Sequence, residues 1–353
     1  MRLIFIVKHF TMERYIHLFE TEAEFNEARQ NNYYEPWVSY TEASERVDYN
    51  EPDWLKVPLT FQALGSGNVS WTLYESTLLY SKNGGAWTEM NSGTSIPVVS
   101  GDEIKFKGTN TSYQTKPFSS TAQFILKGNI MSITNGDDFE NADATTNYMF
   151  DRLFQNCTSL ISANKLQLPA TTIQMACYYG MFSGCTSLTA APQVLPATTV
   201  GQESYNSMFK GCTSLTSVPD VLPARTLASS CYSGMFSGCS SLTKAPALPA
   251  TALQQYCYSS MFSGCTSLAK APVLPAINLA QYCYSNMFNG CTELNYIKAM
   301  FKTNITASTS YTNNWVKLAG SSTGTFVKNS EATWNLSGWN GVPDGWTIET
   351  ASA

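Results

Sequence analysis

The hydrophobic positions of this chain repeat with a fixed period between about residues 148 and 300. The segment Phe-x-x-Cys-x-x-Leu occurs six times there, and its cysteines are separated by 28, 27, 27, 26 and 26 residues. A tyrosine, a methionine and a second cysteine follow the same period, so the region is built from repeats. The motif cysteines are Cys157, Cys185, Cys212, Cys239, Cys265 and Cys291, and the periodic tyrosines are Tyr178, Tyr205, Tyr232, Tyr258 and Tyr284. The second cysteine is Cys177, Cys231, Cys257 or Cys283, with Ser204 in its place once.

One unit of about 27 residues cannot bury its own hydrophobic side, whereas stacked units share a continuous core. Equivalent side chains should therefore form ladders, which are columns of stacked side chains running through successive repeats. The Tyr-x-x-Met-Phe segment has helical spacing and predicts a short helix that ends at the Gly-Cys step. The segment from Leu242 to Leu248 predicts a strand, because Pro246 and Pro249 exclude a helix. Such strands should pair into a parallel sheet.

The repeats resemble a known family. Met-Phe-Ser-Gly-Cys-Thr-Ser-Leu-Thr at residues 181–189 and Met-Phe-Ser-Gly-Cys-Ser-Ser-Leu-Thr at residues 235–243 are similar to the BspA-like class of bacterial leucine-rich repeats. The resemblance covers about residues 148–300 and implies a curved solenoid used for adhesion to proteins, cells or glycans. Units of that class are usually shorter, and the longer period here implies an extra half-turn or loop in each repeat.

The exposed strand face of such a solenoid is the usual binding surface. Positions that vary between units mark this surface, because the ladders tolerate little change. The candidate ligand-binding residues are Lys165, Gln193, Asp220, Lys244 and Lys270. The alternative is that these side chains are solvent-exposed and bind no ligand. The tyrosine ladder is interpreted as core, with a sugar platform as its alternative. Within one strand, Leu242, Ala245 and Leu248 should point inward, and Thr243, Lys244 and Pro246 should lie nearer the surface.

The regions before the repeats suggest two further modules. Residues 1–54 predict a βαββ docking module, with a strand at 15–19, a capping box at Thr21 and Glu24 that opens a helix, and strands at 37–40 and 46–49. This module resembles N-terminal segments of structural proteins from phages and prophages of Bacteroidetes. Met12 is an alternative start for the natural product. Residues 55–135 predict an immunoglobulin-like β-sandwich, with a hairpin turn at residues 82–85.

Residues 301–353 lose the period and predict a β-rich cap over the end of the 136–300 solenoid. Trp334, Trp339 and Trp346 are expected to close that end, and a sugar-stacking platform is the alternative. The predicted fold class is therefore multi-domain α+β/β: a βαββ module, an immunoglobulin-like sandwich, and a leucine-rich-repeat solenoid with its cap.

The charge content narrows the function. Only 13% of residues are charged, about half the usual share. The net charge of −5 does not indicate a surface that binds nucleic acid. No apolar run of about 18 residues predicts a membrane-spanning helix. The apolar stretch at residues 3–7 is too short for a signal peptide. We therefore expect no nucleic-acid partner and no membrane insertion.

Catalytic chemistry is not expected. The chain has two histidines, His9 and His17, and neither lies near a repeat cysteine in sequence. Residues 157–300 hold three dispersed carboxylates, Glu203, Asp220 and Glu293, which do not suggest a glycosidase pair. Neither a cofactor motif nor a zinc-type cysteine spacing occurs. The ten cysteines are interpreted as reduced ladders of small buried side chains, with disulfides and metal binding as alternatives.

These patterns lead to a functional hypothesis. The protein is expected to be a non-enzymatic virion protein that docks on other virion proteins through its N-terminal module and binds a host surface glycan or protein. The missing signal peptide and the unpaired cysteines favour a phage protein folded in a reducing cytosol. A bacterial cell-surface adhesin is the main alternative, and an enzyme with a binding solenoid is a third. The oligomeric state, including a homo-oligomer, stays open.

Overall fold

The computed structural model describes residues 52–73, 78–114, 117–306, 308, 310–320 and 322–351, and the backbone of two short strands near the N-terminus. The chain divides into two compact units, Met1–Pro52 and Asp53–Ala353. In the first unit, β1 (Ile4–Ile6) pairs antiparallel with β2 (Ile16–Leu18). The helix and the two later strands predicted for the docking module lie outside the described residues. The domain boundaries at residues 54, 135 and 300 stay predictions.

The second unit begins with two β-sheets that pack face to face. The larger has the strand order β11-β10-β3-β8-β5-β6, and the smaller has the order β7-β4-β9. Trp71 of the small sheet contacts Phe106 of the large sheet with ring centroids 5.3 Å apart, which places a hydrophobic core between the sheets. The strands are β3 (Thr60–Ala63), β4 (Gly67–Trp71), β5 (Leu79–Lys82), β6 (Thr88–Glu89), β7 (Ser95–Val98), β8 (Glu103–Lys107), β9 (Phe118–Ser120), β10 (Phe124–Asn129) and β11 (Leu160–Gln167).

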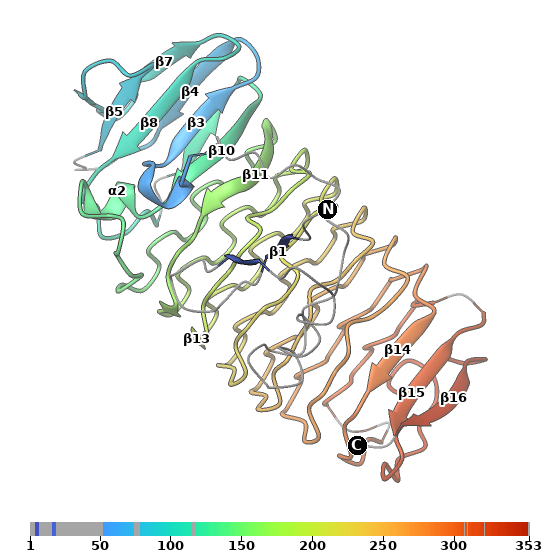
Figure 1. Cartoon of the computed structure of the whole chain (residues 1–353). Helices are drawn as coiled ribbons and strands as arrows, with labels where there is room; N and C mark the ends of the chain where they lie inside the picture. Colours follow the sequence, from blue (N-terminus) through green and yellow to red (C-terminus); the bar gives the residue numbers. More distant parts are fainter. Residues whose placement is uncertain are drawn as a thin grey trace. The chain divides into compact units, whose positions relative to one another are not determined.

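The hairpin predicted at residues 82–85 is confirmed, but the immunoglobulin-like sandwich is not. Strands β5 and β6 pair antiparallel, and Asn83 and Gly84 take positive φ angles of 51° and 74° between them. An immunoglobulin-like sandwich contains antiparallel strands only. Here β10 pairs parallel with β11, a strand of the first repeat, so the large sheet continues into the repeats (Figure 1). The parallel pairing hides the edge of the sheet and joins it to the repeat region.

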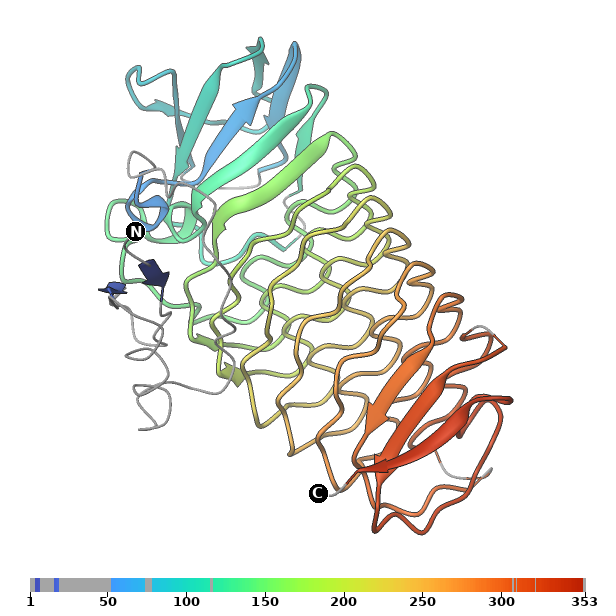
Figure 2. The ribbon, with the colours of Figure 1, turned by 45° about the vertical axis from the view of Figure 1, so that its right-hand side comes forward.

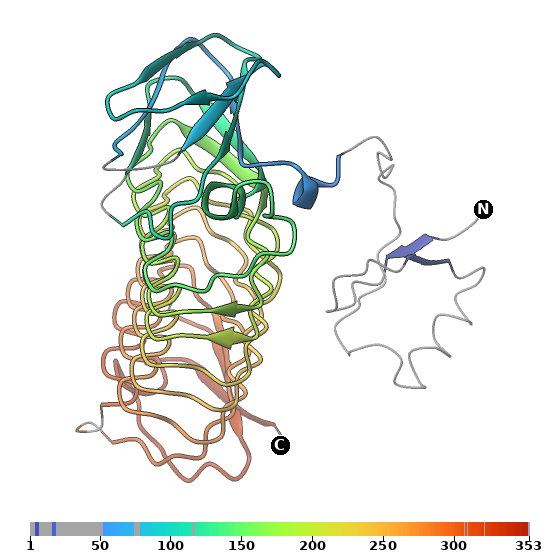
Figure 3. The same cartoon turned by 90° about the vertical axis from the view of Figure 1, so that its left-hand side faces the viewer.

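The repeats stack as successive coils, each about one repeat long (Figures 1 and 2). Their backbones are joined by hydrogen bonds between neighbouring coils, as in Phe182 N–H to the carbonyl oxygen of Met208 at 2.8 Å. Figure 3 shows the coils following one another through the second unit. The stack therefore depends on contacts between units rather than on structure inside one unit.

The predicted helix is absent from the described repeats and is replaced by consecutive β-turns. In the second coil, Ala176, Gly180 and Gly184 have φ angles of 51°, 54° and 77°. Backbone N–H groups alternate between two partners: Met181 bonds back to Tyr178, and Phe182 bonds to the next coil. A positive φ angle at every fourth residue ends each helical hydrogen-bond pattern before it can continue. Turns four residues long reproduce the spacing that suggested a helix, so the helix prediction is wrong.

The predicted parallel sheet is also mostly absent. Along the middle coils the extended segments meet only through isolated bridges, such as Ala190 with Ser217 and Val221 with Ala247. Pairs of prolines in these segments, such as Pro246 and Pro249, remove the N–H donors that a continuous ladder needs. Elsewhere in the described repeats, β12 (Thr172–Ile173) pairs with β13 (Thr199–Val200).

The segment from Leu242 to Leu248 departs from its predicted orientation at two positions. Leu242 and Leu248 are buried as expected, and Thr243 and Lys244 are exposed. Pro246 is buried although it was expected near the surface, and Ala245 is only half-buried. A segment that does not follow a regular strand loses the strict alternation of inward and outward side chains.

The core of the coils consists of stacked ladders. Adjacent rings of the tyrosine ladder lie 5.5–6.1 Å apart, and those of the phenylalanine ladder lie 5.4–5.8 Å apart, all nearly parallel. The motif cysteine thiols donate to a phenylalanine carbonyl one coil back, as in Cys185 Sγ to Phe154 at 3.0 Å. Identical residues at equivalent positions therefore fill the core with repeated contacts.

The C-terminal residues end the stack with a parallel sheet of β14 (Tyr296–Ala299), β15 (Thr325–Asn329) and β16 (Thr347–Ala351). Trp334 stacks on Phe301 with centroids 5.0 Å apart, and its indole N–H donates to the carbonyl of Phe301. Trp315, which sequence patterns did not single out, is also fully buried there. Trp346 is buried as well, whereas Trp339 is 56% exposed.

The predicted fold class, α+β with a leucine-rich-repeat solenoid, is thus wrong. The described residues form strands, turns and irregular segments, with almost no helix. Their helices are one 3-10 turn, η1 (Trp54–Lys56), and one four-residue helix, α2 (Ser132–Asn135). Their strands form several small sheets, none of which runs the length of the repeats. Within the same residues, no helix has the length and apolar character needed to cross a membrane.

Candidate functional site

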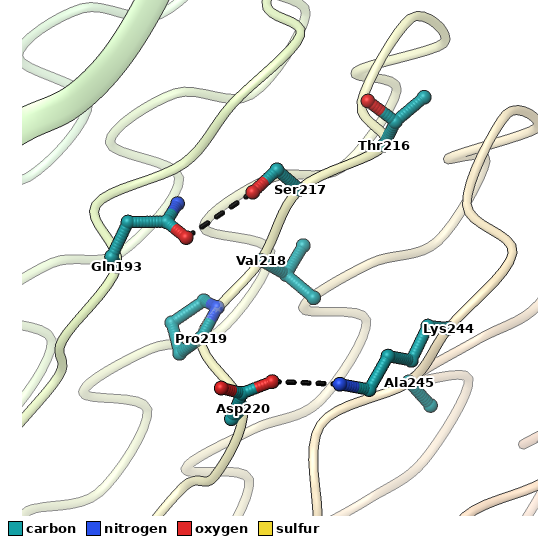
Figure 4. A pocket seen from close by; sticks show the side chains of 8 residues that line it. All are labelled: Gln193, Thr216, Ser217, Val218, Pro219, Asp220, Lys244 and Ala245. Atoms are coloured by element: carbon teal, nitrogen blue, oxygen red, sulfur yellow. Dashed lines mark hydrogen bonds and ion pairs between the residues drawn. The ribbon is translucent and has the colours of Figure 1, made fainter. Parts of the chain in front are cut away.

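Three of the five candidate residues, Gln193, Asp220 and Lys244, come together in one groove on neighbouring coils (Figure 4). The cavity has a volume of about 190 Å³. Pockets that enclose a whole small molecule usually measure roughly 300–1,000 Å³. The groove can therefore take one group of a larger ligand. Its lining residues, called the binding groove below, are Gln193, Thr216, Ser217, Val218, Pro219, Asp220, Lys244 and Ala245.

The groove lies where the repeat changes length. Leu215 and Leu242 are 27 residues apart, but the backbone bridge that follows joins Val221 to Ala247, which are 26 residues apart. Five residues of one coil, 216–220, thus lie beside four residues of the next, 243–246. The two backbones cannot stay in contact over unequal lengths. This mismatch accounts for a hollow at this point in the stack.

The polar side chains of the groove are bonded to one another but remain open to solvent. Lys244 Nζ lies 2.8 Å from Asp220 Oδ1, with the two side chains 76% and 84% exposed. Ser217 Oγ donates to Gln193 Oε1 at 3.2 Å. An exposed ion pair contributes about 0–1 kcal/mol, so a ligand could replace it at little cost. The groove offers a cation, an anion and an amide within a short span.

The other two candidates lie elsewhere. Lys165 Nζ lies over the ring of Trp54, 5.6 Å from the centroid. Lys270 Nζ lies over the ring of Tyr296 at 4.7 Å. Lys270 follows Leu268 by two residues, as Lys244 follows Leu242, so it occupies the equivalent position one coil further on. The sequence could not show this division, because it depends on where the coil length changes.

The ladder residues are placed in the core. All ten cysteines are free and buried, and the five periodic tyrosines are almost fully buried. Burial raises the pKa of the thiols of Cys157, Cys212, Cys257 and Cys291 to about 12, from an ordinary value of 9.0. These thiols stay protonated at neutral pH and are weak nucleophiles. Both histidines belong to the other compact unit, Met1–Pro52.

A pair of surface tyrosines was missed in the sequence. Tyr256 and Tyr282, the tyrosine pair, stack at 4.8 Å with rings only 1° from parallel, and Tyr256 is 37% exposed. Each has a φ angle of 56°. Such a conformation costs a bulky residue about 1–3 kcal/mol, while a stacked aromatic pair returns about 0.5–1.5 kcal/mol. The same φ angle occurs at this position in the preceding coil, at Ser230 with 55°, so it belongs to the turn and does not require a tyrosine. The exposed, stacked rings make the pair a functional candidate.

No protein-family model, curated protein or solved structure matches the chain. The resemblance to BspA-like repeats therefore stays a prediction. Among the residues that the structure describes, no group of three or more histidine, cysteine or acidic side chains could hold a metal ion.

Proposed function

We propose that the protein is a non-enzymatic attachment protein of a phage particle that recognises a glycan or a protein on the host surface. The binding groove is the observation that carries this proposal. It collects variable, exposed polar residues from three coils, whereas the tyrosine, methionine, phenylalanine, cysteine and leucine residues that recur in the coils are buried. The protonated, buried thiols add support, because the groups most capable of covalent chemistry are withdrawn from solvent.

The place on a phage particle rests on the N-terminal module and on its resemblance to phage structural proteins. In this arrangement the module would attach to other virion proteins and the coils would contact the host. A particle protein folded in a reducing cytosol would keep ten free cysteines. Purified particles and an outer-membrane fraction should be compared by mass spectrometry. Presence in particles is expected. Absence from particles, together with surface labelling on intact cells, would replace the proposal with a bacterial adhesin.

Recognition through the groove can be tested with the full chain labelled by a fluorophore and applied to candidate host cells. The double variant Asp220→Ala/Lys244→Ala removes both charges of the groove. It should weaken cell binding about tenfold or more, because a hydrogen bond to a charged group is worth about 1.5–3 kcal/mol. Lys270→Ala is the control, since it removes a cation at the position equivalent to Lys244, one coil away. Equal effects of both variants would contradict a role for the groove. Breakdown of host polysaccharide by the purified chain would contradict the non-enzymatic assignment.

A further inference from the structure

One corner of the coils carries a column of residues with positive φ angles, which begins with Tyr148 and Ala176. Its next four members are Glu203, Ser230, Tyr256 and Tyr282, at 56°, 55°, 56° and 56°. These four residues lie in four consecutive coils. The backbone N–H of each of the first three donates a hydrogen bond to a carbonyl of the following coil, at 3.0–3.1 Å. The four residues thus occupy equivalent positions in consecutive coils.

The aromatic part of this column stops after two rings. Tyr256 stacks on Tyr282 on one side, and on its other side the next residue in the column is Ser230. Successive rings elsewhere in the coils lie 5.4–6.1 Å apart, so one coil step corresponds to one ring. Ser230 carries no ring, so within the column the place of one ring beside the outer face of Tyr256 is unfilled, and Tyr256 is 37% exposed. This place is called the space below. Glu203 stands one coil beyond this space.

The residues next to the tyrosine pair carry uncharged hydrogen-bonding groups. Gln255 and Gln281, each one residue before a tyrosine of the pair, are exposed, and the Gln255 side-chain N–H donates to Gln281 at 3.0 Å. Two joined amides still present both a donor and an acceptor to solvent. Ser230 adds a hydroxyl. A ligand here needs a flat apolar face of ring size and polar groups at its rim that both donate and accept.

The geometry points to a binding slot for one pyranose residue of a neutral glycan, stacked on Tyr256 above Ser230. The C–H face of a sugar ring packs on an aromatic face, and its hydroxyl groups both donate and accept hydrogen bonds at the rim. Glu203 accepts hydroxyl hydrogens and repels anions, so an acidic sugar is disfavoured. A cation would also be attracted to the ring and to Glu203, but it could not use the acceptor and donor pair of the amides.

The slot can be tested by calorimetric titration of the full chain with hexasaccharides of glucose, mannose, galactose and xylose, and with hexagalacturonic acid. At least one neutral hexasaccharide should bind, and more tightly than the acidic one. Tyr256→Gly should weaken that binding about tenfold, equivalent to about 1.4 kcal/mol. Glycine adopts this φ angle without strain, so the variant keeps its fold. Tyr256→Phe keeps the ring and should bind nearly as wild type.

Two further variants distinguish a loss of sugar binding at the slot from a general effect of substitution on the fold. Tyr148→Gly is the matched control, because Tyr148 has the same type of position in the first coil with a φ angle of 58°. It should leave binding unchanged. Ser230→Tyr should fill the slot and abolish binding, since tyrosine is accepted at this position in the next two coils.

Three results would overturn the slot. They are no binding of any neutral hexasaccharide, unchanged binding by Tyr256→Gly or Ser230→Tyr, and binding of tetramethylammonium in place of sugar. The assay uses purified sugars, so its failure is distinct from a failure of attachment to host cells through the binding groove.

Discussion

Replacing Ser204 with cysteine should stabilise the protein, because this serine interrupts a ladder of buried cysteines. The equivalent residues of the coils on either side are Cys177 and Cys231. Ser204 is fully buried, and its hydroxyl oxygen has no hydrogen-bond partner among the described residues. Its backbone is bonded like that of its neighbours, with the Tyr178 N–H donating to the Ser204 carbonyl at 2.8 Å. The substitution therefore changes one buried atom and no backbone contact.

The expected gain follows from the cost of the buried hydroxyl. A buried polar group without a partner costs about 1–3 kcal/mol, and a buried thiol behaves as a small hydrophobic group. The larger sulfur atom fits the equivalent site in neighbouring coils, so overpacking should cost little. We expect Ser204→Cys to raise the free energy of unfolding by about 1–2 kcal/mol.

Urea denaturation followed by circular dichroism, in reducing buffer at pH 7, measures this change as a shift in midpoint at constant slope. Ser204→Ala is the first control, since it removes the hydroxyl without adding the sulfur and should gain less. Cys231→Ser is the second, because it introduces a second buried hydroxyl and should lose about 1–3 kcal/mol. If Ser204→Cys gave no gain while Cys231→Ser gave no loss, the reasoning from the unpartnered hydroxyl would be refuted.

Two other predictions concern the turns and the thiols. Gly238→Ala should lower the free energy of unfolding by about 1–2 kcal/mol, because Gly238 has a φ angle of 76° that alanine adopts only with strain. Gly65→Ala, where a new Cβ meets open space, should cost nothing in the same urea titration; equal effects of both would refute the strain argument. Stability should also fall above pH 9, because unfolded thiols ionise there while the buried thiol of Cys212 holds its proton up to a pKa of about 12. Each such thiol removes about 1.4 kcal/mol per pH unit in this window, so an unfolding free energy that stayed constant from pH 8 to pH 11 would contradict the burial argument.

Much of the core could be predicted from the sequence, because the residues that repeat are the residues that stack. Tyr258 and Cys265 recur at fixed intervals, and both are buried in the ladders. The hairpin around Asn83 and Gly84 was also predictable, since those residue types adopt positive φ angles readily.

The local conformation of the coil could not be predicted in the same way. Tyr178, Met181 and Phe182 are spaced as on a helix, and a chain of four-residue turns gives the same spacing. Glycines four residues apart, Gly180 and Gly184, are the one clue to turns in this coil. In other coils the position of Gly180 can hold arginine or serine, as at Arg152 and Ser207, whose residue types do not indicate a positive φ angle.

The candidate sites lie where the repeat pattern is broken, and this has a physical cause. Every coil is held to the next by backbone hydrogen bonds, which do not depend on which side chain a residue carries. Tyr256 and Tyr258 both donate a backbone N–H to the following coil, yet one ring is exposed and the other is buried. An outward position can therefore change to a strained tyrosine, or a segment can gain a residue beside Asp220, without loss of the stack. The core fixes the distance between coils. The residues that depart from the repeat pattern provide the polar and aromatic groups on the surface. A ligand that contacts two or three coils would recognise a particular combination of departures, which a perfectly regular repeat could not provide.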